Sequence, residues 1–350
     1  MSFSTDLLSW YDGRIRDLPW RGEQDPYRIW LSEIMLQQTQ AATVRHYYIR
    51  FLEHFPTVFH LAKTDEQSVL KLWEGLGYYS RARNLQKTAR IVAENLSGRF
   101  PDSAKALLAL PGIGPYTANA IASIAYGEPV PALDGNQARV IARAEAWDHP
   151  LKTPFDLLTP ALERMDPQRP GDYNQALMDL GATLCTPRAP ACEGCPVAAH
   201  CRAHLEGDPL DYPRKSPPSE KKQQERTVLL LAMDGRILVR RREGGLLEGL
   251  YGFVDIEGHH DPERLLQSLL AMGFVGPVIT KELPDSRHVF THRIWRMKGW
   301  MGTCLGAPQG YIPVDAAALS LLPFPSAFSV YLDIAREWLG PPHPDAQSRK

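Results

Sequence analysis

The sequence predicts a chain of two domains with different fold classes, an all-α domain followed by an α+β domain. Apolar residues at helical spacing dominate residues 1–205, whereas residues 226–340 carry short β-branched runs separated by turn signals and one amphipathic helix. Between them, residues 206–225 are rich in proline and charge and poor in apolar side chains, which predicts a linker. The last residues, 341–350, read as a tail. A chain of 350 residues is long enough for two separate cores.

Charge and hydropathy limit the possible function classes. The chain has 39 basic and 40 acidic residues, so any nucleic-acid surface must be a local patch. One candidate patch has helical spacing, although a solvated helix face has the same pattern; it consists of Arg81, Arg83, Lys87 and Arg90. No apolar run is long enough to cross a bilayer, and the N-terminus lacks a signal-peptide layout. We therefore expect a cytoplasmic protein with no membrane partner. We also expect it to be a monomer, although composition and charge do not determine the oligomeric state.

One helix is predicted to begin at Asp25-Pro26 and to run to Val44. Glu33 lies inside its apolar stretch, and an inward orientation would raise the pKa of this carboxyl. A lone helix glutamate more often faces solvent. Gln38 and Thr39 follow, and by themselves they would read as a polar helix end.

The stretch LPGIGP predicts a tight hairpin between two helices over about residues 102–125. Gly112 and Gly114 permit positive φ and a close approach of another backbone. The amides that open the second helix form a seat for one phosphate. Asp134 then starts an Asp-Gly-Asn turn, so one short unit offers a phosphate grip and a carboxylate. An ordinary αα-hairpin with glycine in its turn is the alternative.

Two further patterns suggest function. Leu76 and Tyr78 lie on a glycine-flanked bend, where an apolar or aromatic side chain could wedge between stacked bases or merely pack the turn. Four of the five cysteines have the spacing Cys185-x6-Cys192-x2-Cys195-x5-Cys201. Such a set can hold zinc or an iron–sulfur cluster, although zinc sites usually have two paired C-x-x-C knuckles.

The hairpin, Asp134 and the segment SEIMLQQTQ around Glu33 together resemble the helix-hairpin-helix DNA glycosylases of base excision repair, and most closely the adenine DNA glycosylases. The cysteine spacing matches the [4Fe–4S] loop at residues 185–201 of endonuclease III-like relatives. This resemblance implies a [4Fe–4S] cofactor whose loop lies against DNA phosphates, with Arg188 and Arg202 available.

The resemblance also assigns roles to individual residues. Glu33 would be the catalytic acid and Asp134 an ionised carboxylate that stabilises or traps the sugar cation. Tyr116 occupies the place of the lysine found in relatives that also nick DNA, and tyrosine cannot form a Schiff base. Tyr116 and Asn136 would bond to the two carboxyls. The residues expected to contact DNA or the extruded base are Arg21, Gln38, Thr39, Leu76, Tyr78, Gly112, Gly114 and Gln175.

The second domain resembles the Nudix-like domain of adenine glycosylases. Asp234-Gly235 predicts a hairpin, and helices are expected at 261–272 and near 325–339. The first of these helices has too few carboxylates for a Nudix magnesium site, so we expect a binding module. The stretch from His288 to His292 would correspond to a Phe-Ser-His loop that reads 8-oxoguanine, and it contains His288, Phe290, Thr291 and His292. Thr291 replaces the usual serine. A plain strand with two histidines is the alternative.

The resemblance implies a monofunctional adenine DNA glycosylase that acts on double-stranded, nucleoid-associated DNA with A:8-oxoguanine or A:G mispairs. Two other readings remain open. One is a glycosylase of the same fold that acts on thymine or uracil mismatches or on oxidised pyrimidines. The other is a DNA-binding or redox-sensing iron–sulfur protein without catalysis, which the pairing of Glu33 with Asp134 opposes.

Overall fold

The computed structural model describes residues 2–214 and 221–341. By its internal contacts the chain forms two compact units. Unit 1 consists of Met1–Thr64 and Ser80–Pro218, and unit 2 consists of Asp65–Tyr79 and Ser219–Lys350. A short segment from the helical part of the sequence therefore groups with the C-terminal unit, which we did not expect from the sequence.

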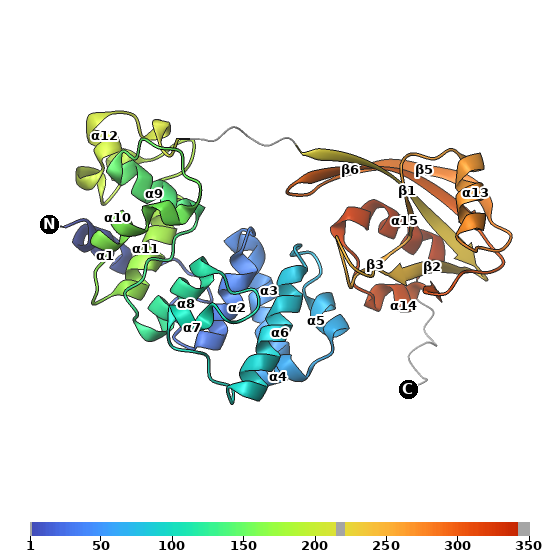
Figure 1. Cartoon of the computed structure of the whole chain (residues 1–350), viewed down its shortest axis with the longest axis horizontal. Coiled ribbons are helices and arrows are strands. Elements are labelled where there is room, and N and C mark those ends of the chain that lie inside the picture. The colour runs from blue at the N-terminus through green and yellow to red at the C-terminus, as the bar shows by residue number, and fades with distance from the viewer. Residues whose placement is uncertain (1, 215–220, 342–350) are drawn as a thin grey trace. The chain divides into compact units, whose positions relative to one another are not determined.

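Unit 1 is all-α, as predicted (Figure 1). Its longer helices are α1 (Phe3–Asp12), α2 (Pro26–Leu36), α3 (Ala41–His54), α6 (Ser80–Asn95), α8 (Pro115–Tyr126), α9 (Gly135–Glu145) and α11 (Pro170–Thr183). Its shorter helices are α4 (Val58–Lys63), α7 (Ala104–Leu107), α10 (Leu158–Glu163) and α12 (Arg202–Glu206). One core joins α1, α9 and α11, with Leu7, Ile141 and Leu177 fully buried.

The helix predicted through Val44 is in fact two helices, and this expectation was wrong. α2 ends at Leu36 and α3 begins at Ala41, because Gln38 adopts a left-handed conformation with φ 56°. No proline or glycine marks the break in the sequence. The cause is tertiary: Arg81 donates to the carbonyl oxygens of Met35 and Gln37 and so satisfies the end of α2.

Unit 2 contains a seven-stranded mixed sheet in which β1 (Lys222–Met233) pairs in parallel with β6 (Arg293–Thr303). The other pairings are antiparallel. The remaining strands are β2 (Arg236–Arg241), β3 (Tyr251–Gly252), β4 (Val254–Glu257), β5 (Val278–Val289) and β7 (Tyr311–Val314). The helices are α5 (Glu66–Leu72), α13 (Pro262–Ala271), α14 (Ala316–Leu321) and α15 (Ser329–Leu339).

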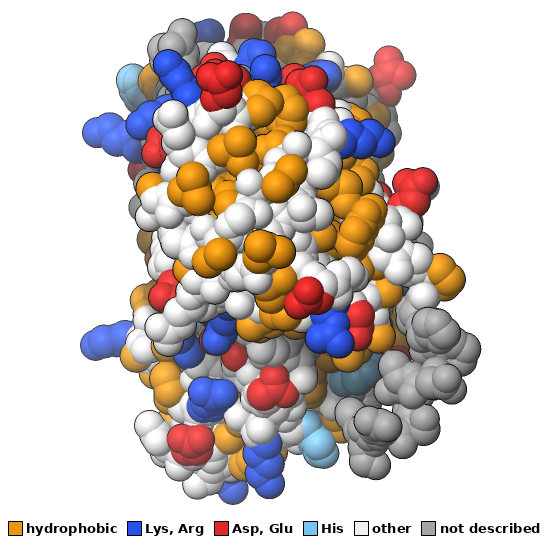
Figure 2. Space-filling view, turned by 90° about the vertical axis from the view of Figure 1, so that its right-hand side faces the viewer, with side chains coloured by type: hydrophobic (Ala, Val, Ile, Leu, Met, Phe, Trp, Pro, Cys, Tyr) orange, Lys and Arg blue, Asp and Glu red, His pale blue; other side chains and the backbone are white. Residues whose placement is uncertain are grey.

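Alternation along β1 produces two cores, one on each face of the sheet. Val228 and Leu230 face a core with residues of α15, whereas Leu229 and Leu231 face a core with residues of α13. The sheet is therefore covered by helices on both faces, as Figure 1 shows. Figure 2 shows a face on which apolar side chains are interspersed with both signs of charge. In the described part of the chain, no helix is both long and apolar enough to span a membrane.

Several elements of unit 2 are those predicted. The Asp234-Gly235 turn joins β1 to β2, and α13 and α15 lie at the expected positions. The predicted linker, residues 206–225, was too long. β1 already begins at Lys222, because the polar residues at its start pair through their backbone with β6 while their side chains remain exposed. The polar composition of these residues correctly indicated that their side chains are exposed, but it did not indicate that their backbone forms a strand.

Candidate active site

A cavity of about 1040 Å³ opens in unit 1. It lies where the loop before α2, the C-terminal end of α2, the start of α8, the turn before α9 and one face of α11 meet. Its lining combines both carboxyls that the sequence singled out with several hydrogen-bonding side chains. These include Arg16, Arg21, Glu33, Gln37, Gln38, Thr39, Tyr116, Asp134, Asn136 and Asp179.

Glu33 reaches this cavity from the buried face of α2. Asp25 caps the helix by accepting from the Tyr27 amide at 2.9 Å, and Pro26 opens it. The Glu33 side chain is 3% exposed. Burial raises the pKa of Glu33 to about 7, while a hydrogen bond with Tyr116 and the charge of Arg21 act in the opposite direction. The carboxyl therefore holds its proton for about half of the time near neutral pH, which suits a general acid.

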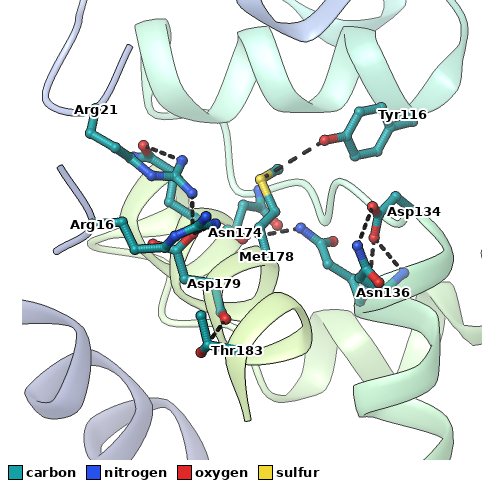
Figure 3. A network of polar contacts seen from close by, with 11 residues as sticks. Arg16, Arg21, Tyr116, Asp134, Asn136, Asn174, Met178, Asp179 and Thr183 are labelled. Carbon is teal, nitrogen blue, oxygen red and sulfur yellow. Dashed lines mark hydrogen bonds and ion pairs between the residues drawn. The ribbon is translucent and has the colours of Figure 1, made fainter. Parts of the chain in front are cut away.

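Tyr116 lies in the first turn of α8, after the N-cap Gly114 and the helix-opening Pro115. Its hydroxyl donates to the Met178 sulfur at 3.8 Å (Figure 3). Burial raises the pKa of Tyr116 well above its ordinary value. The phenol therefore remains protonated and acts as a donor within the site.

Asp134 is the N-cap of α9. Its Oδ1 accepts from the backbone amides of Asn136 and Gln137, both at 2.8 Å, and its Oδ2 accepts from the Asn136 amide group at 3.4 Å (Figure 3). Burial is the largest influence and raises the pKa of Asp134 above its ordinary value; the hydrogen bonds from these donors and the charge of Arg139 offset only part of that rise. The three donors fix the position of the carboxyl group, and each of them favours its ionised form.

The segment that leads to Asp134 is fixed from α11. Asn174 is fully buried; its Oδ1 accepts from the Ala132 amide at 3.0 Å and its Nδ2 donates to the Val130 carbonyl at 2.9 Å. α11 also approaches closely at Gly181, where a Cβ would come within 3.0 Å of the Asn136 Cβ. Helix α11 therefore sets the position of the turn that carries Asp134.

A charged cluster lines the α11 side of the cavity. Arg21 donates through Nη1 to Gln175 Oε1 at 2.9 Å and through Nη2 to Asp179 Oδ1 at 2.5 Å (Figure 3). Arg16 donates to the same Asp179 oxygen at 3.4 Å. The sequence pointed to Arg21 and Gln175, and the structure brings them together.

The polar turn between α2 and α3 lies at the cavity edge. Gln38 is exposed, and Arg81 donates to the Thr39 hydroxyl at 3.1 Å. Gln37 donates to the Thr117 hydroxyl at 3.1 Å and so joins the turn to α8. Arg81 is itself buried, so the predicted surface patch of Arg81, Arg83, Lys87 and Arg90 is wrong for its first member.

The helical hairpin joins α7 to α8. Gly112 has φ 77°, and a Cβ there would lie 2.7 Å from the Asn84 Cβ, so only glycine fits without a shift. Gly114 differs from expectation. It is the extended N-cap of α8 with φ −89°, so it needs no left-handed conformation.

The four clustered cysteines, Cys185, Cys192, Cys195 and Cys201, line one small cavity in unit 1. Burial raises the pKa values of Cys192, Cys195 and Cys201, with the Cys195 thiol at about 11. A cationic metal centre reverses this preference because it stabilises thiolates. Four cysteine side chains around one cavity match the four thiolate ligands of an iron–sulfur cluster.

In unit 2, the glycine-flanked bend and the loop between β5 and β6 meet. Tyr78 is 47% exposed with φ 47°, and its hydroxyl lies 2.8 Å from the Thr291 hydroxyl. Leu76 is only 5% exposed, so the structure contradicts a wedge role for it. The Phe290 ring packs 5.0 Å from the Trp295 ring, and the His288 ring lies 4.6 Å from Phe290. His292 is exposed beside them.

Comparison with known proteins agrees with this geometry. Residues 31–159 match the HhH-GPD superfamily of base excision DNA repair proteins, residues 185–201 match the iron–sulfur binding domain of endonuclease III, and residues 227–333 match the NUDIX domain. The chain is 38% identical over 352 residues to the adenine DNA glycosylase of Rattus norvegicus, with 83% of this chain and 68% of the relative covered. The chain belongs to the adenine DNA glycosylase family.

Other family members and solved structures extend the comparison. The human adenine DNA glycosylase is 37% identical over 354 residues, covering 83% of this chain and 65% of its own length. A thermostable thymine-DNA glycosylase is 32% identical with a TM-score of 0.53, covering 58% of this chain and 95% of its own. Endonuclease III trapped on DNA shares the fold, with a TM-score of 0.50 at 21% identity over 58% of this chain and 93% of its own.

Family membership establishes that the chain is a DNA N-glycosylase with a [4Fe–4S] cluster, and it confirms the predicted fold class. The cluster would be held by the four cysteines, and the Arg143 guanidinium lies 3.3 Å from the Cys185 sulfur. This donor helps to hold the Cys185 thiolate, and the bound cluster would staple the loop from Cys185 to Cys201.

Sequence reasoning missed two residues of the candidate site, Arg16 and Asp179. Both line the cavity, and they contact each other. Asp179 lies four residues after Gln175, one helical turn away on the same face of α11. That spacing was the available signal.

Proposed function

We propose that this chain removes adenine from duplex DNA where the base is paired with 8-oxoguanine or guanine. The observation that carries the proposal is the convergence of Glu33 and Asp134 on one cavity, where burial raises the pKa of Glu33 to about 7 and two backbone amides donate to Asp134. Two carboxyl groups of this kind suit the cleavage of a glycosidic bond through a cation-like transition state.

The reaction begins with the adenine nucleotide swung out of the duplex, because the bond cannot be reached inside the stack. Glu33 gives its proton to the adenine ring while the N-glycosidic bond breaks and its electron pair leaves with the base. Asp134, held by the amides of Asn136 and Gln137, stabilises the cationic sugar or traps it covalently. Water then adds to the sugar carbon, and the Glu33 carboxylate accepts its proton.

Tyr116 makes the enzyme a hydrolase without strand-nicking activity. A nicking glycosylase forms a Schiff base between an amine and the opened sugar, and a phenol cannot do this. The protonated Tyr116 hydroxyl instead orients Glu33. Arg21 and Gln175 contact the extruded base, with their positions fixed from α11.

Unit 2 reads the lesion opposite the target base. Tyr78 is the exposed wedge, and Thr291 offers a hydroxyl to the oxidised purine beside Phe290, His288 and His292. α13 carries only one carboxylate, Glu263, so we assign this unit a binding role. In unit 1, Gln38 and Thr39 fill the space of the extruded base.

The DNA backbone is held by the helical hairpin and the iron–sulfur loop. The start of α8 lines the cavity at Gly114, where unpaired amides favour a phosphate, and Gly112 permits the tight turn. Arg188 and Arg202 are exposed near the cysteines and supply positive charge. These contacts position the duplex and carry no sequence information.

The test is a single-turnover assay on duplexes with one central adenine opposite 8-oxoguanine, guanine or thymine, followed by alkali and a denaturing gel. We expect alkali-labile sites opposite 8-oxoguanine and guanine, with no breaks before alkali. A thymine:guanine duplex tests the competing hypothesis that the enzyme is a mismatch glycosylase that removes thymine. Thymine release with no adenine release would overturn the proposal.

A further inference from the structure

Asp179 is an acidic side chain on α11 that the mechanism above does not use. It is 1% exposed, and one of its oxygens, Oδ1, accepts from both Arg21 and Arg16, at 2.5 and 3.4 Å (Figure 3). Its other oxygen, Oδ2, is buried and has no hydrogen-bond partner among the described residues. A buried carboxylate persists only when nearby positive charge stabilises it.

Helix α11 grips Arg21 at two points. Gln175 and Asp179 lie one turn apart and accept from the two terminal nitrogens of the same guanidinium. Arg21 is 8% exposed, and these two hydrogen bonds fix the orientation of its guanidinium group. Arg16, at 34% exposed, reaches the same oxygen from the more open side.

Arg21 and Glu33 line the same cavity, and the positive charge of Arg21 opposes the rise in the pKa of Glu33. The groups around Glu33 come from several elements: Tyr116 from α8, Asp134 from the start of α9, and Arg21 from the loop before α2. Arg81 from α6 lies at the carbonyl end of α2. Asp179 from α11 is connected to these groups through its hydrogen bond with Arg21.

We propose that Asp179 is a positioning and charge-compensating residue: it holds Arg21 in place and offsets its positive charge, so that Glu33 keeps the proton that it gives to the base. This inference rests on the proposed acid role of Glu33. A bare guanidinium at the same place would favour the ionised form of Glu33, and an ionised Glu33 has no proton to donate.

The size of the effect follows from the placement of the charges. An opposite charge within a few ångströms moves a carboxyl pKa by roughly one unit or more, and part of that influence is cancelled when the cation is itself paired. Removing the negative charge of Asp179 leaves the positive charges of both Arg21 and Arg16 without this partner. We therefore expect the pKa of Glu33 to fall, and the pH range of activity with it.

The experiment is the pH dependence of single-turnover adenine release by the full-length holoenzyme carrying Asp179→Asn, which keeps shape and removes charge. The alkaline limb of the profile should move to lower pH by about one unit, so the rate near pH 7 drops about fivefold while the rate at lower pH is largely regained. Asp172→Asn is the matched control, because Asp172 is on the same helix and pairs with Arg169, and neither of these residues is among those that line the cavity. The alkaline limb of the pH profile of Asp172→Asn should coincide with that of the wild type.

A double-mutant cycle that removes each charge separates the electrostatic role of Asp179 from a structural one. Arg21→Gln should move the limb to higher pH, even though its plateau falls, and Asp179→Asn with Arg21→Gln should return the limb close to its original place. A lower plateau with an unmoved limb in Asp179→Asn would show that Asp179 is merely structural, and would overturn the inference.

The two proposals fail differently. A wild-type enzyme that releases no adenine from any duplex contradicts the proposed function. An active wild-type enzyme whose limb does not respond to Asp179 or Arg21 contradicts only the role of Asp179. If Asp179→Asn does not fold, Arg21→Gln alone decides, because an unmoved limb in that variant also removes the basis of the inference.

Discussion

The two units treat their functional side chains in opposite ways. In unit 1 the groups proposed to react are withdrawn from water: Glu33 is 3% exposed, and Asp134 accepts hydrogen bonds from two amides of α9. In unit 2 the side chains proposed to read DNA stand outside, with Tyr78 47% exposed and Thr291 on a turn. The same chain therefore contains one site built by burial and one built by exposure.

The difference follows from the work each site does. A proton donor works best with a pKa near neutral, and burial is the largest cause of the raised pKa of Glu33. A loop that recognises a base must bind the base and release it again. Such a loop depends on short-range hydrogen bonds and shape complementarity, and it does not need side chains with shifted pKa values. Variants in unit 1 should therefore change rate by orders of magnitude, and variants in unit 2 should change selectivity by small factors.

The largest effect is expected from Glu33→Gln. The substitution keeps the shape of the side chain and removes the transferable proton, so single-turnover adenine release should fall by about 10²- to 10⁴-fold. Binding to the A:8-oxoguanine duplex, measured by gel shift, should be nearly unchanged. Turnover at the wild-type rate would refute the acid role.

Asp134→Asn comes next, with an expected rate loss of about 10²- to 10³-fold because the charge facing the sugar cation disappears. Asparagine caps helices as well as aspartate does, so the melting temperature should hardly change. Asp261→Asn is the matched control, since Asp261 caps α13 in the same way. A similar rate loss in both variants would point to capping instead of electrostatics.

The third effect is on stability. The folded pKa of Glu33 is about 7 against an ordinary 4.5, so the native state binds the proton more tightly than the unfolded chain. Its stabilising contribution is full below pH 4.5 and is lost as pH rises through 7. Glu33→Gln should therefore gain about 2 kcal/mol in unfolding free energy over wild type between pH 5 and pH 8, measured by denaturant titration. A constant difference would contradict the buried, protonated state.

The smallest effect belongs to unit 2. Thr291→Val removes one hydroxyl and keeps the volume, so preference for 8-oxoguanine over guanine should fall about five- to tenfold, as expected for one hydrogen bond. Release opposite guanine should be unchanged. Thr280→Val, on β5 with its hydroxyl bonded to the Met301 carbonyl, is the control. Equal losses for both partner bases would place Thr291 outside lesion reading.

Sequence patterns captured the features that depend on local residues. The cysteine spacing identified the cluster loop, Asp234-Gly235 identified the hairpin, and the apolar surroundings of Glu33 raised the possibility of an inward carboxyl. These features could be predicted because they depend only on the spacing of residues and on their neighbours in the sequence.

Features that depend on tertiary contacts were missed. Arg81 looked like part of a basic surface, yet it is buried against the carbonyl end of α2. The sequence analysis did not single out Asp179, because its contacts with Arg16 and Arg21 come from a loop that is distant in the sequence. Likewise, nothing in residues 65–79 indicates that they group with unit 2, and Leu76 could not be told from Tyr78 until burial separated them.

The most direct test is the pKa of Glu33 itself. It can be measured by ¹³C NMR on holoenzyme labelled at the glutamate carboxyl carbons, with the signal assigned by its absence in Glu33→Gln. A titration midpoint near 7 is the predicted result. A midpoint near the ordinary glutamate value would show an ionised carboxylate at neutral pH and would contradict the account of Glu33 as the acid.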